Sequence, residues 1–236
     1  MIRVVTLCSG YDSQCLALER LKKAHPDFDY ELVAWSEIDK YAIQAHNTLF
    51  PQWADRNVGD MTKADWSKIG GCDLLTYSTP CQSISNAGKQ KGITEGSGTR
   101  SSIIWSTRNA IKELKPKYLM LENVSAFVSK KFIGEFKKWM AELESYGYVN
   151  YFAPSFDKPW STLKDRRTKM YCLNSKNYGV PQNRERVFVI SILGGGGYEY
   201  PEPFKLNRFL DDVLFDKVDD KYYLSEEAIK NFFPNE

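Results

Sequence analysis

Residues 4–12 read Val-Val-Thr-Leu-Cys-Ser-Gly-Tyr-Asp, a short apolar run that passes into a loop of small and polar side chains. Residues 13–23 follow with the pattern of a helix, in which Leu16, Leu18 and Leu21 are the apolar positions. A strand that enters a helix through a glycine-containing loop is the opening unit of a doubly wound fold, and nucleotides bind at the carboxyl end of such a strand. The stretch therefore predicts an α/β fold with a candidate nucleotide-binding loop around Gly10.

The same alternation continues along the chain. Strand-like apolar runs occupy residues 31–35, 73–77, 117–121 and 187–193, and helical patterns occupy residues 40–49, a stretch ending near Leu114, and residues 132–146. This order predicts a Rossmann-like fold, with a mixed, mostly parallel sheet and helices on both faces. Four consecutive glycines at residues 194–197 interrupt the pattern. We expect one main domain over residues 1–193 and a hinge and linker over residues 194–236.

Charge and cysteine content limit the classes of protein to which the chain can belong. The formal net charge is +2, yet residues 158–186 hold eight basic residues against two acidic ones, a local excess that suits a polyanion or a solvated surface. Five cysteines and two histidines form no CxxC pair or His-rich cluster, so the sequence predicts no metal site. The amino-terminal apolar run is too short for a signal peptide or a membrane helix. We expect a soluble, cytoplasmic protein without a membrane segment.

The strongest candidate for chemistry is Cys81. It follows the predicted strand 73–77 in the stretch Thr79-Pro80-Cys81-Gln82, at the carboxyl edge of the sheet, where a thiolate can act as a nucleophile. Most cysteines are small core residues instead, an interpretation that suits Cys15, Cys72 and Cys172 better than Cys81.

Charged residues follow the other predicted strands. Glu37 and Asp60 can accept hydrogen bonds from a ribose and an adenine amino group, although isolated acids after strands are usually solvated. Glu122 ends the strand 117–121 and is expected to face the same crevice as Cys81. Arg184 and Arg186 lead into the last strand and share one face of it, so at least one of them is expected to have a designated partner rather than to be surface charge.

Three of these stretches occur together, and in this order, in one family. Pro80-Cys81-Gln82, Glu122-Asn123-Val124 and Gln182-x-Arg184-x-Arg186 resemble motifs of the DNA (cytosine-5) methyltransferases of bacterial or phage type. Residues 36–42 and 88–92 add flanking matches, and the resemblance covers roughly residues 3–193. A chance match of one tripeptide is common, whereas three in order with the expected strand context form a specific signal.

The resemblance implies methyl transfer from S-adenosylmethionine to C5 of cytosine, with S-adenosylhomocysteine as product. Cys81 would add to C6 of a cytosine flipped out of double-stranded DNA, and Glu122 would hold N3 and the exocyclic amine. Arg186 would bind the ring O2, and Arg184 would brace Glu122. The implied cofactor pocket is lined by Cys8, Ser9, Gly10, Glu37, Ile38, Asp60, Met61 and Pro80. The implied DNA contacts are Gln82, Ser85, Lys89, Lys91 and Arg100.

The chain also departs from the family pattern. Cys8 stands where the family usually has a phenylalanine, and Asp12-Ser13 stands in place of a glycine pair. The family's target-recognition domain and final segment are expected to be missing, which indicates either a truncated product or a second polypeptide that supplies target recognition. The family context favours a restriction–modification or prophage modification system.

Three other functions compete with this interpretation. A tRNA cytosine methyltransferase would share the motifs, and the insertion at residues 155–169 favours DNA only modestly. An incomplete, non-enzymatic subunit is opposed by the intact Cys81, Glu122 and Arg186. A nicotinamide-dependent oxidoreductase would be expected to carry a GxGxxG fingerprint, which is missing from the first loop.

Overall fold

The computed structural model describes residues 1–85, 91–153 and 172–232. The chain divides into two compact units. The first unit comprises Met1–Asn174 and Glu185–Glu202, and the second comprises Ser175–Arg184 and Pro203–Glu236. The glycine run at residues 194–197 lies inside the first unit, and all four glycines have positive φ, a conformation that glycine adopts without steric cost.

The first unit is built on a mixed sheet. Its strands in the order β2-β1-β3-β4-β7-β5 form a continuous path, and β6 pairs with β7. Strands β1, β2, β3 and β4 pair with one another in parallel, whereas β7 is antiparallel to β4, β5 and β6. The strands are β1 (Ile2–Leu7), β2 (Tyr30–Ser36), β3 (Leu74–Tyr77), β4 (Tyr118–Val124), β5 (Tyr148–Phe152), β6 (Cys172–Asn174) and β7 (Glu185–Leu193).

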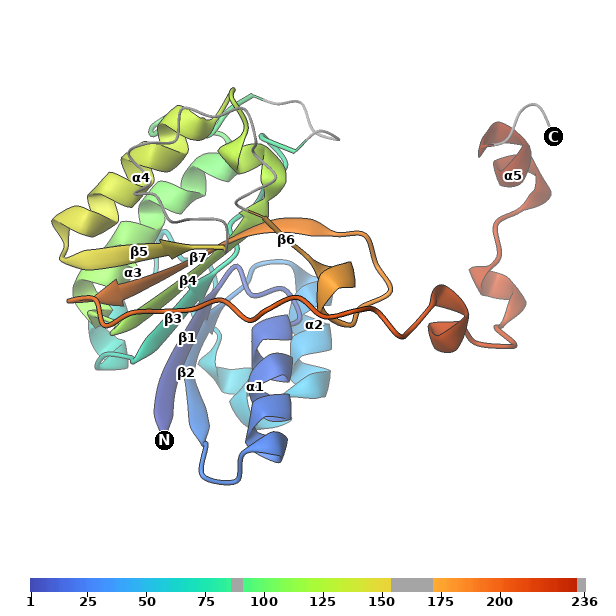
Figure 1. Cartoon of the computed structure of the whole chain (residues 1–236), viewed down its shortest axis with the longest axis horizontal. Helices are drawn as coiled ribbons and strands as arrows, with labels where there is room; N and C mark the ends of the chain where they lie inside the picture. The colour runs from blue at the N-terminus through green and yellow to red at the C-terminus, as the bar shows by residue number, and fades with distance from the viewer. Residues whose placement is uncertain (86–90, 154–171, 233–236) are drawn as a thin grey trace. The chain divides into compact units, whose positions relative to one another are not determined.

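Helices cover both faces of this sheet (Figure 1), which confirms the predicted fold class. Helices α1 (Ser13–Ala24) and α2 (Lys40–Leu49) lie on one face, and α3 (Thr107–Leu114) and α4 (Ile133–Ser145) lie on the other. Each face has its own apolar core. The smaller core joins Cys15 of α1 to Leu32 and Trp35 of β2. The larger core packs the buried face of α4 and the apolar positions of α3 against the central strands.

The parallel strands bring their carboxyl ends to one edge of the sheet, and the loops that follow β1, β2 and β3 therefore meet there. The segment after the β3 loop begins with a 3₁₀ helix, η3 (Arg100–Ser106), which runs directly into α3. The sequence predicts a single helix ending near Leu114. The structure divides it because the first turn follows i→i+3 bonding before the α-helical pattern of Ala110, Ile111 and Leu114 begins.

The second unit contains short 3₁₀ turns and helix α5 (Glu226–Phe232). Its apolar side chains are largely exposed, including Phe209, Leu214, Phe215 and Tyr222. Among the described residues, no helix is long and apolar enough to cross a membrane, and no group of three or more histidine, cysteine or acidic residues is arranged to hold a metal ion.

Candidate active site

The loop that carries Cys81 is anchored to β4 at its first residues. Tyr77 of β3 pairs with Leu121 of β4, so Ser78 and Thr79 come opposite Glu122 and Asn123. The Ser78 hydroxyl donates a hydrogen bond to the Glu122 carboxylate. The Asn123 side-chain amide donates to the Thr79 carbonyl oxygen over 3.2 Å. These two contacts bind the strand end two residues before Cys81 to the strand that carries Glu122.

The Glu122 carboxylate is held from its other side by β7. The antiparallel register places Arg186 opposite Val124, and the Arg186 Nε lies 3.1 Å from a Glu122 carboxylate oxygen. The side chains of Glu122 and Arg186 are 19% and 22% exposed, so the ion pair is only partly screened by solvent. One carboxylate is therefore oriented by a hydroxyl from β3 and a guanidinium from β7.

Arg184 belongs to the second unit. Its backbone N–H donates to the Gln182 carbonyl, and its own carbonyl accepts from the Ser175 N–H, each over 3.0 Å. The sequence assigned the bracing of Glu122 to Arg184, and in the structure it is Arg186 that pairs with Glu122. The role of Arg184 stays a prediction.

Cys81 is a partly buried free thiol at the start of a tight turn. Its carbonyl oxygen accepts from the backbone N–H groups of Ile84 and Ser85, over 2.9 and 2.8 Å. Three other thiols have environments that oppose ionisation. Burial raises the pKa values of Cys8, Cys72 and Cys172 to about 12, and for Cys8 the negative charges of Glu37 and Asp60 add to the effect.

The loop after Cys81 is bonded to the start of η3 at several points. The exposed Arg100 donates to the Gln82 side-chain oxygen over 3.0 Å, and the Ser83 N–H donates to the Ser101 hydroxyl over 3.0 Å. The Gly92 N–H returns to the Ser83 carbonyl over 2.9 Å. The predicted DNA-contact residues Gln82, Lys91 and Arg100 are exposed and Ser85 is partly exposed, while Lys89 lies outside the described residues.

The loops after β1 and β2 meet through Glu37. One Glu37 carboxylate oxygen accepts from the Gly10 N–H over 2.9 Å, and the other accepts from the N–H groups of Ile38 and Asp39 over 2.8 and 2.9 Å. Gly10 has φ +60, and no atom lies within 4 Å of the position that a Cβ would occupy there. Three backbone amides therefore fix one carboxylate beside the predicted nucleotide loop.

The third acidic candidate is occupied locally. One Asp60 carboxylate oxygen accepts from the N–H and the hydroxyl of Thr62, over 2.9 and 2.7 Å. These bonds hold the Asp60 pKa below its usual range. The neighbouring Met61 is buried, and its sulfur lies 3.6 Å from the Cys8 sulfur. Met61 therefore packs against Cys8, the first residue of the loop after β1.

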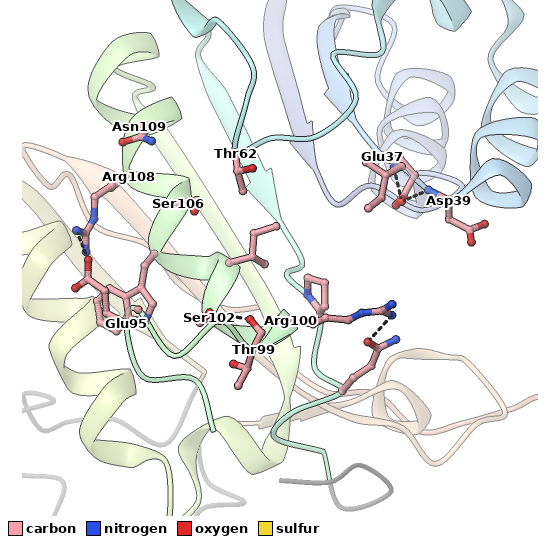
Figure 2. A pocket seen from close by; sticks show the side chains of 17 residues that line it. Glu37, Asp39, Thr62, Glu95, Thr99, Arg100, Ser102, Ser106, Arg108 and Asn109 are labelled. Atoms are coloured by element: carbon pink, nitrogen blue, oxygen red, sulfur yellow. Dashed lines mark hydrogen bonds and ion pairs between the residues drawn. The ribbon is translucent and has the colours of Figure 1, made fainter. Parts of the chain in front are cut away.

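A cleft of about 1050 Å³ runs between the β2 loop and the η3–α3 segment (Figure 2). Figure 2 shows Glu37 and Asp39 at one end, and Arg108 and Glu95 at the other. Five predicted residues line it: Glu37, Ile38, Pro80, Gln82 and Arg100. The other predicted cofactor residues, Cys8, Ser9, Gly10, Asp60 and Met61, lie outside its lining and support the loops around it.

Sequence reasoning missed the second wall of the cleft. That wall includes Glu95, Thr99, Ser102, Ile103, Trp105, Ser106, Arg108 and Asn109. The stretch has no chemical motif, and only its position after the Cys81 loop could have indicated it. Asp39 and Thr62 were also missed, although each lies one or two residues from a predicted site residue, Ile38 or Asp60.

The donors and acceptors at the Glu37 end fit a nucleoside. The Glu37 carboxylate can accept from ribose hydroxyls, and Ile38, with 73% of its surface exposed, offers an apolar face for a base. A cleft of this size is at the upper end of the range for small-molecule sites. The geometry therefore supports a nucleoside-containing cofactor at this end and a nucleophile beyond Pro80.

Comparison with known families identifies the family of the chain. The model of the C-5 cytosine-specific DNA methylase family matches residues 2–235. The chain belongs to this family.

Among curated relatives, the type II methyltransferase M2.ScrFI of Lactococcus lactis subsp. cremoris is 39% identical over 75% of this chain and 44% of its own length. The orphan methyltransferase M.Rho11sI of Bacillus phage rho11s is 32% identical over 96% of this chain and 46% of its own length. The chain thus spans about half the length of these curated relatives.

Solved structures confirm the fold of this DNA methylase family member. The Entamoeba histolytica methyltransferase EhMeth matches with a TM-score of 0.72 and 18% identity, over 98% of this chain and 66% of its own. The S. pombe Dnmt2 methyltransferase matches with a TM-score of 0.66 and 18% identity, over 99% and 66%. At this identity the likeness concerns the fold alone.

Proposed function

We propose that this chain transfers a methyl group from S-adenosylmethionine to C5 of cytosine in DNA, through a covalent bond between Cys81 and the base. The observation that carries the proposal is the Glu122 carboxylate, held between Ser78 and Arg186 at the root of the Cys81 loop. A fixed carboxylate beside a loop nucleophile is the arrangement that addition to a pyrimidine ring needs.

The chemistry follows from the electronic structure of cytosine, whose C5 is a poor nucleophile. The Cys81 thiolate adds to C6, and the C5–C6 double bond becomes an enamine-like system that is nucleophilic at C5. After C5 has gained the methyl group, a base removes the C5 proton, the double bond re-forms, and the Cys81–C6 bond breaks to return the thiolate.

Glu122 acts on the opposite edge of the ring. Its carboxyl group hydrogen-bonds N3 and the exocyclic amine, and thereby stabilises the charge that develops on the ring as Cys81 adds. Arg186 holds Glu122 in place and supplies positive charge for the ring O2.

The cofactor, when bound, supplies an electrophilic methyl group on a sulfonium and leaves as S-adenosylhomocysteine. Glu37 would hold its ribose, Ile38 and Pro80 would contact its base, and Asp60 would accept from the adenine amino group. Ser9, Gly10, Met61 and Cys8 would shape the loops that surround it.

The substrate follows from the same geometry. C6 is inaccessible within a duplex, so the target cytosine has to leave the base stack before Cys81 can reach it. Gln82, Ser85, Lys89, Lys91 and Arg100 would contact the DNA backbone and the vacated position. Residues 1–193 would form the catalytic and cofactor-binding domain and residues 194–236 the link to target recognition, supplied by a second polypeptide or by a longer chain. Relatives that are type II and orphan methyltransferases of bacteria and phages support a modification system.

A methyl-transfer assay tests the proposal and its rival. The protein is incubated with S-adenosylmethionine carrying a radiolabelled methyl group and either duplex DNA or transfer RNA. We expect label in DNA, recovered as 5-methylcytosine, and none with the Cys81→Ser variant. Label in transfer RNA alone would replace DNA by RNA as substrate. Equal labelling by wild type and Cys81→Ser would overturn the covalent mechanism.

A further inference from the structure

Asp12 is a fully buried carboxylate in an unusual backbone conformation. It comes directly before α1, at the end of the loop after β1. Its φ of +66 places its backbone in the left-handed region, which residues other than glycine rarely adopt. A buried carboxyl group and an unfavourable backbone conformation at one residue persist only where surrounding contacts stabilise both.

Those contacts come from two directions. The Thr6 hydroxyl on β1 donates to one Asp12 carboxylate oxygen over 2.7 Å, and the Cys15 N–H on α1 donates to the other over 3.2 Å. Thr6 and Cys15 are both buried. The carboxylate is therefore bonded to the strand before the loop and to the helix after it.

A third contact comes from α2. The His46 side chain is fully buried, and its Nε2 lies 3.8 Å from the Asp12 carboxylate oxygen that accepts from Thr6. Among the described residues, this Nε2 has no hydrogen-bond partner. The imidazole is stacked on Trp35 of β2, with ring centroids 3.6 Å apart, which restricts the plane of the imidazole ring. Asp12 thus faces α2 as well as β1 and α1.

The backbone of Asp12 closes the turn that carries Gly10. The Asp12 N–H donates to the Ser9 carbonyl over 2.9 Å, and the Ser9 N–H donates to the Ser36 carbonyl over 3.1 Å. Between these two points the Gly10 N–H meets the Glu37 carboxylate over 2.9 Å. The position of the Gly10 amide relative to Glu37 therefore depends on where Asp12 is held.

We propose that Asp12, held by the Thr6 hydroxyl and the Cys15 N–H and packed beside His46, is a positioning residue for the cofactor, because it sets the turn through which Gly10 meets Glu37. The inference rests on the proposed cofactor site at Glu37. Asp12 would act without touching the cofactor. It lies beside His46 of α2, and Asp39, the cap of α2, lines the same cleft.

A simpler role would be helix capping alone, since Asp12 also caps α1 through the Cys15 N–H. The two roles differ in which backbone segments Asp12 stabilises. Capping alone stabilises the first turn of α1, whereas positioning also stabilises the Ser9–Gly10 turn. Hydrogen exchange of backbone amides distinguishes them without any cofactor, because three amides of this turn donate hydrogen bonds: Ser9 to Ser36, Gly10 to Glu37 and Asp12 to Ser9.

The experiment compares amide exchange of residues 8–12 in the wild-type chain with that in Asp12→Ala and Thr6→Val. We expect roughly tenfold faster exchange in Asp12→Ala, the effect typical of a lost side-chain acceptor at a helix start, and a smaller increase in Thr6→Val. Asp12→Asn, which keeps an acceptor for the Cys15 N–H and can bond to Thr6, should restore most of the protection. Thr48→Val is the matched control, because its hydroxyl bonds within α2 to the Gln44 carbonyl, away from Asp12.

Calorimetric binding of S-adenosylhomocysteine supplies the second readout. We expect the dissociation constant to rise roughly tenfold in Asp12→Ala and to stay at the wild-type value in Thr48→Val. Faster exchange confined to α1, with residues 8–12 unchanged, would overturn the inference. A wild-type chain that does not bind the product would count against the proposed cofactor site, while the exchange data would still decide the role of Asp12. If Asp12→Ala does not fold, Thr6→Val decides by the same exchange measurement, because it removes the Thr6 hydroxyl that donates to Asp12.

Discussion

Glu122 occupies a position that is contacted from two neighbouring strands. Ser78, directly after β3, donates a hydrogen bond to its carboxylate, and Arg186 on β7 forms an ion pair with it. Replacing Glu122 by Gln keeps the size of the side chain and removes the charge that Arg186 pairs with. We expect methyl transfer to fall at least roughly 100-fold, because general acid–base and charge-stabilising groups contribute on this scale.

The measurement for Glu122→Gln is the single-turnover rate at saturating cofactor, together with the cofactor dissociation constant. We expect the rate to fall and the dissociation constant to stay constant, since Glu122 is not among the residues that line the cofactor cleft. Glu144→Gln on α4 is the control, where the carboxylate bonds only weakly to Asn150 at 3.3 Å. Equal losses in both variants would show that Glu122 has no special role.

Cysteine reactivity gives a second prediction at this scale. Burial raises the pKa of the Cys8, Cys72 and Cys172 thiols to about 12, so at pH 8 roughly one in ten thousand of each is the reactive thiolate, and this fraction rises tenfold for each pH unit up to pH 12. Burial also raises the pKa of Cys15. We expect iodoacetamide at pH 8 to label Cys81 before the other four, as measured by peptide mass mapping. Faster labelling of Cys8 than of Cys81 would contradict this prediction.

The positions of single residues at the sheet edge were predictable from the sequence, because the carboxyl ends of parallel strands meet there. Cys81 and Glu37 follow β3 and β2 as expected, whereas Glu122 lies within β4, which continues to Val124. The pairing of Arg186 rather than Arg184 with Glu122 could not be found in this way. It depends on the register of β7 against β4, where Arg186 comes opposite Val124.

At the scale of elements, Arg108 of α3 joins three segments. Its Nη1 lies 2.6 Å from Glu95 in the segment before η3, and its Nε lies 2.7 Å from Glu142 on α4. The guanidinium also lies over the Trp105 ring, 5.5 Å from its centroid, and the Trp105 indole donates to the Ile93 carbonyl over 2.7 Å. These contacts anchor the distal end of the Cys81 loop to the helical layer.

Replacing Arg108 by Met is expected to destabilise the first unit and slow the reaction. Within the part of the chain that the structure describes, the variant leaves the partly buried Glu142 carboxylate with only the Tyr146 hydroxyl as a partner, a loss of about 1–3 kcal/mol in the free energy of unfolding. Release of Glu95 loosens the loop and should slow adduct formation several-fold at unchanged cofactor affinity.

Glu95→Gln separates the two effects, because it breaks only the contact with the loop. Thermal unfolding and adduct-formation rates of both variants are the measurements. We expect the melting temperature of Glu95→Gln to stay near the wild-type value while its rate falls. An unchanged rate in both variants would show that the anchor has no part in loop function.

The helices and the longer strands were predictable because their apolar residues follow helical or strand spacing over many positions, as in α4 and β7. Strands β5 and β6 were not. β6 has three residues and exists only through pairing with β7, and β5 is an edge strand whose side chains are mostly half-buried. The wall of the cleft from Glu95 to Asn109 was missed for a similar reason, since tertiary packing rather than a motif places it.

At the scale of the whole molecule, the chain belongs to the C-5 cytosine-specific DNA methylase family and spans about half the length of its curated relatives. The cleft, Cys81 and the Glu122–Arg186 ion pair all lie within the first unit. We therefore propose that bond formation to cytosine takes place within this unit.

The most direct test is capture of the covalent complex. The chain is incubated, with and without S-adenosylmethionine, with duplex DNA that contains 5-fluorocytosine, and its intact mass is measured after denaturation. Fluorine replaces the C5 hydrogen, so after methyl transfer there is no C5 proton to remove and the Cys81–C6 bond cannot break. We predict that the wild-type chain forms a protein–DNA adduct in the presence of S-adenosylmethionine and that Cys81→Ser forms none. An adduct that persists in Cys81→Ser, or no adduct in a wild-type chain that binds both cofactor and DNA, would contradict this prediction.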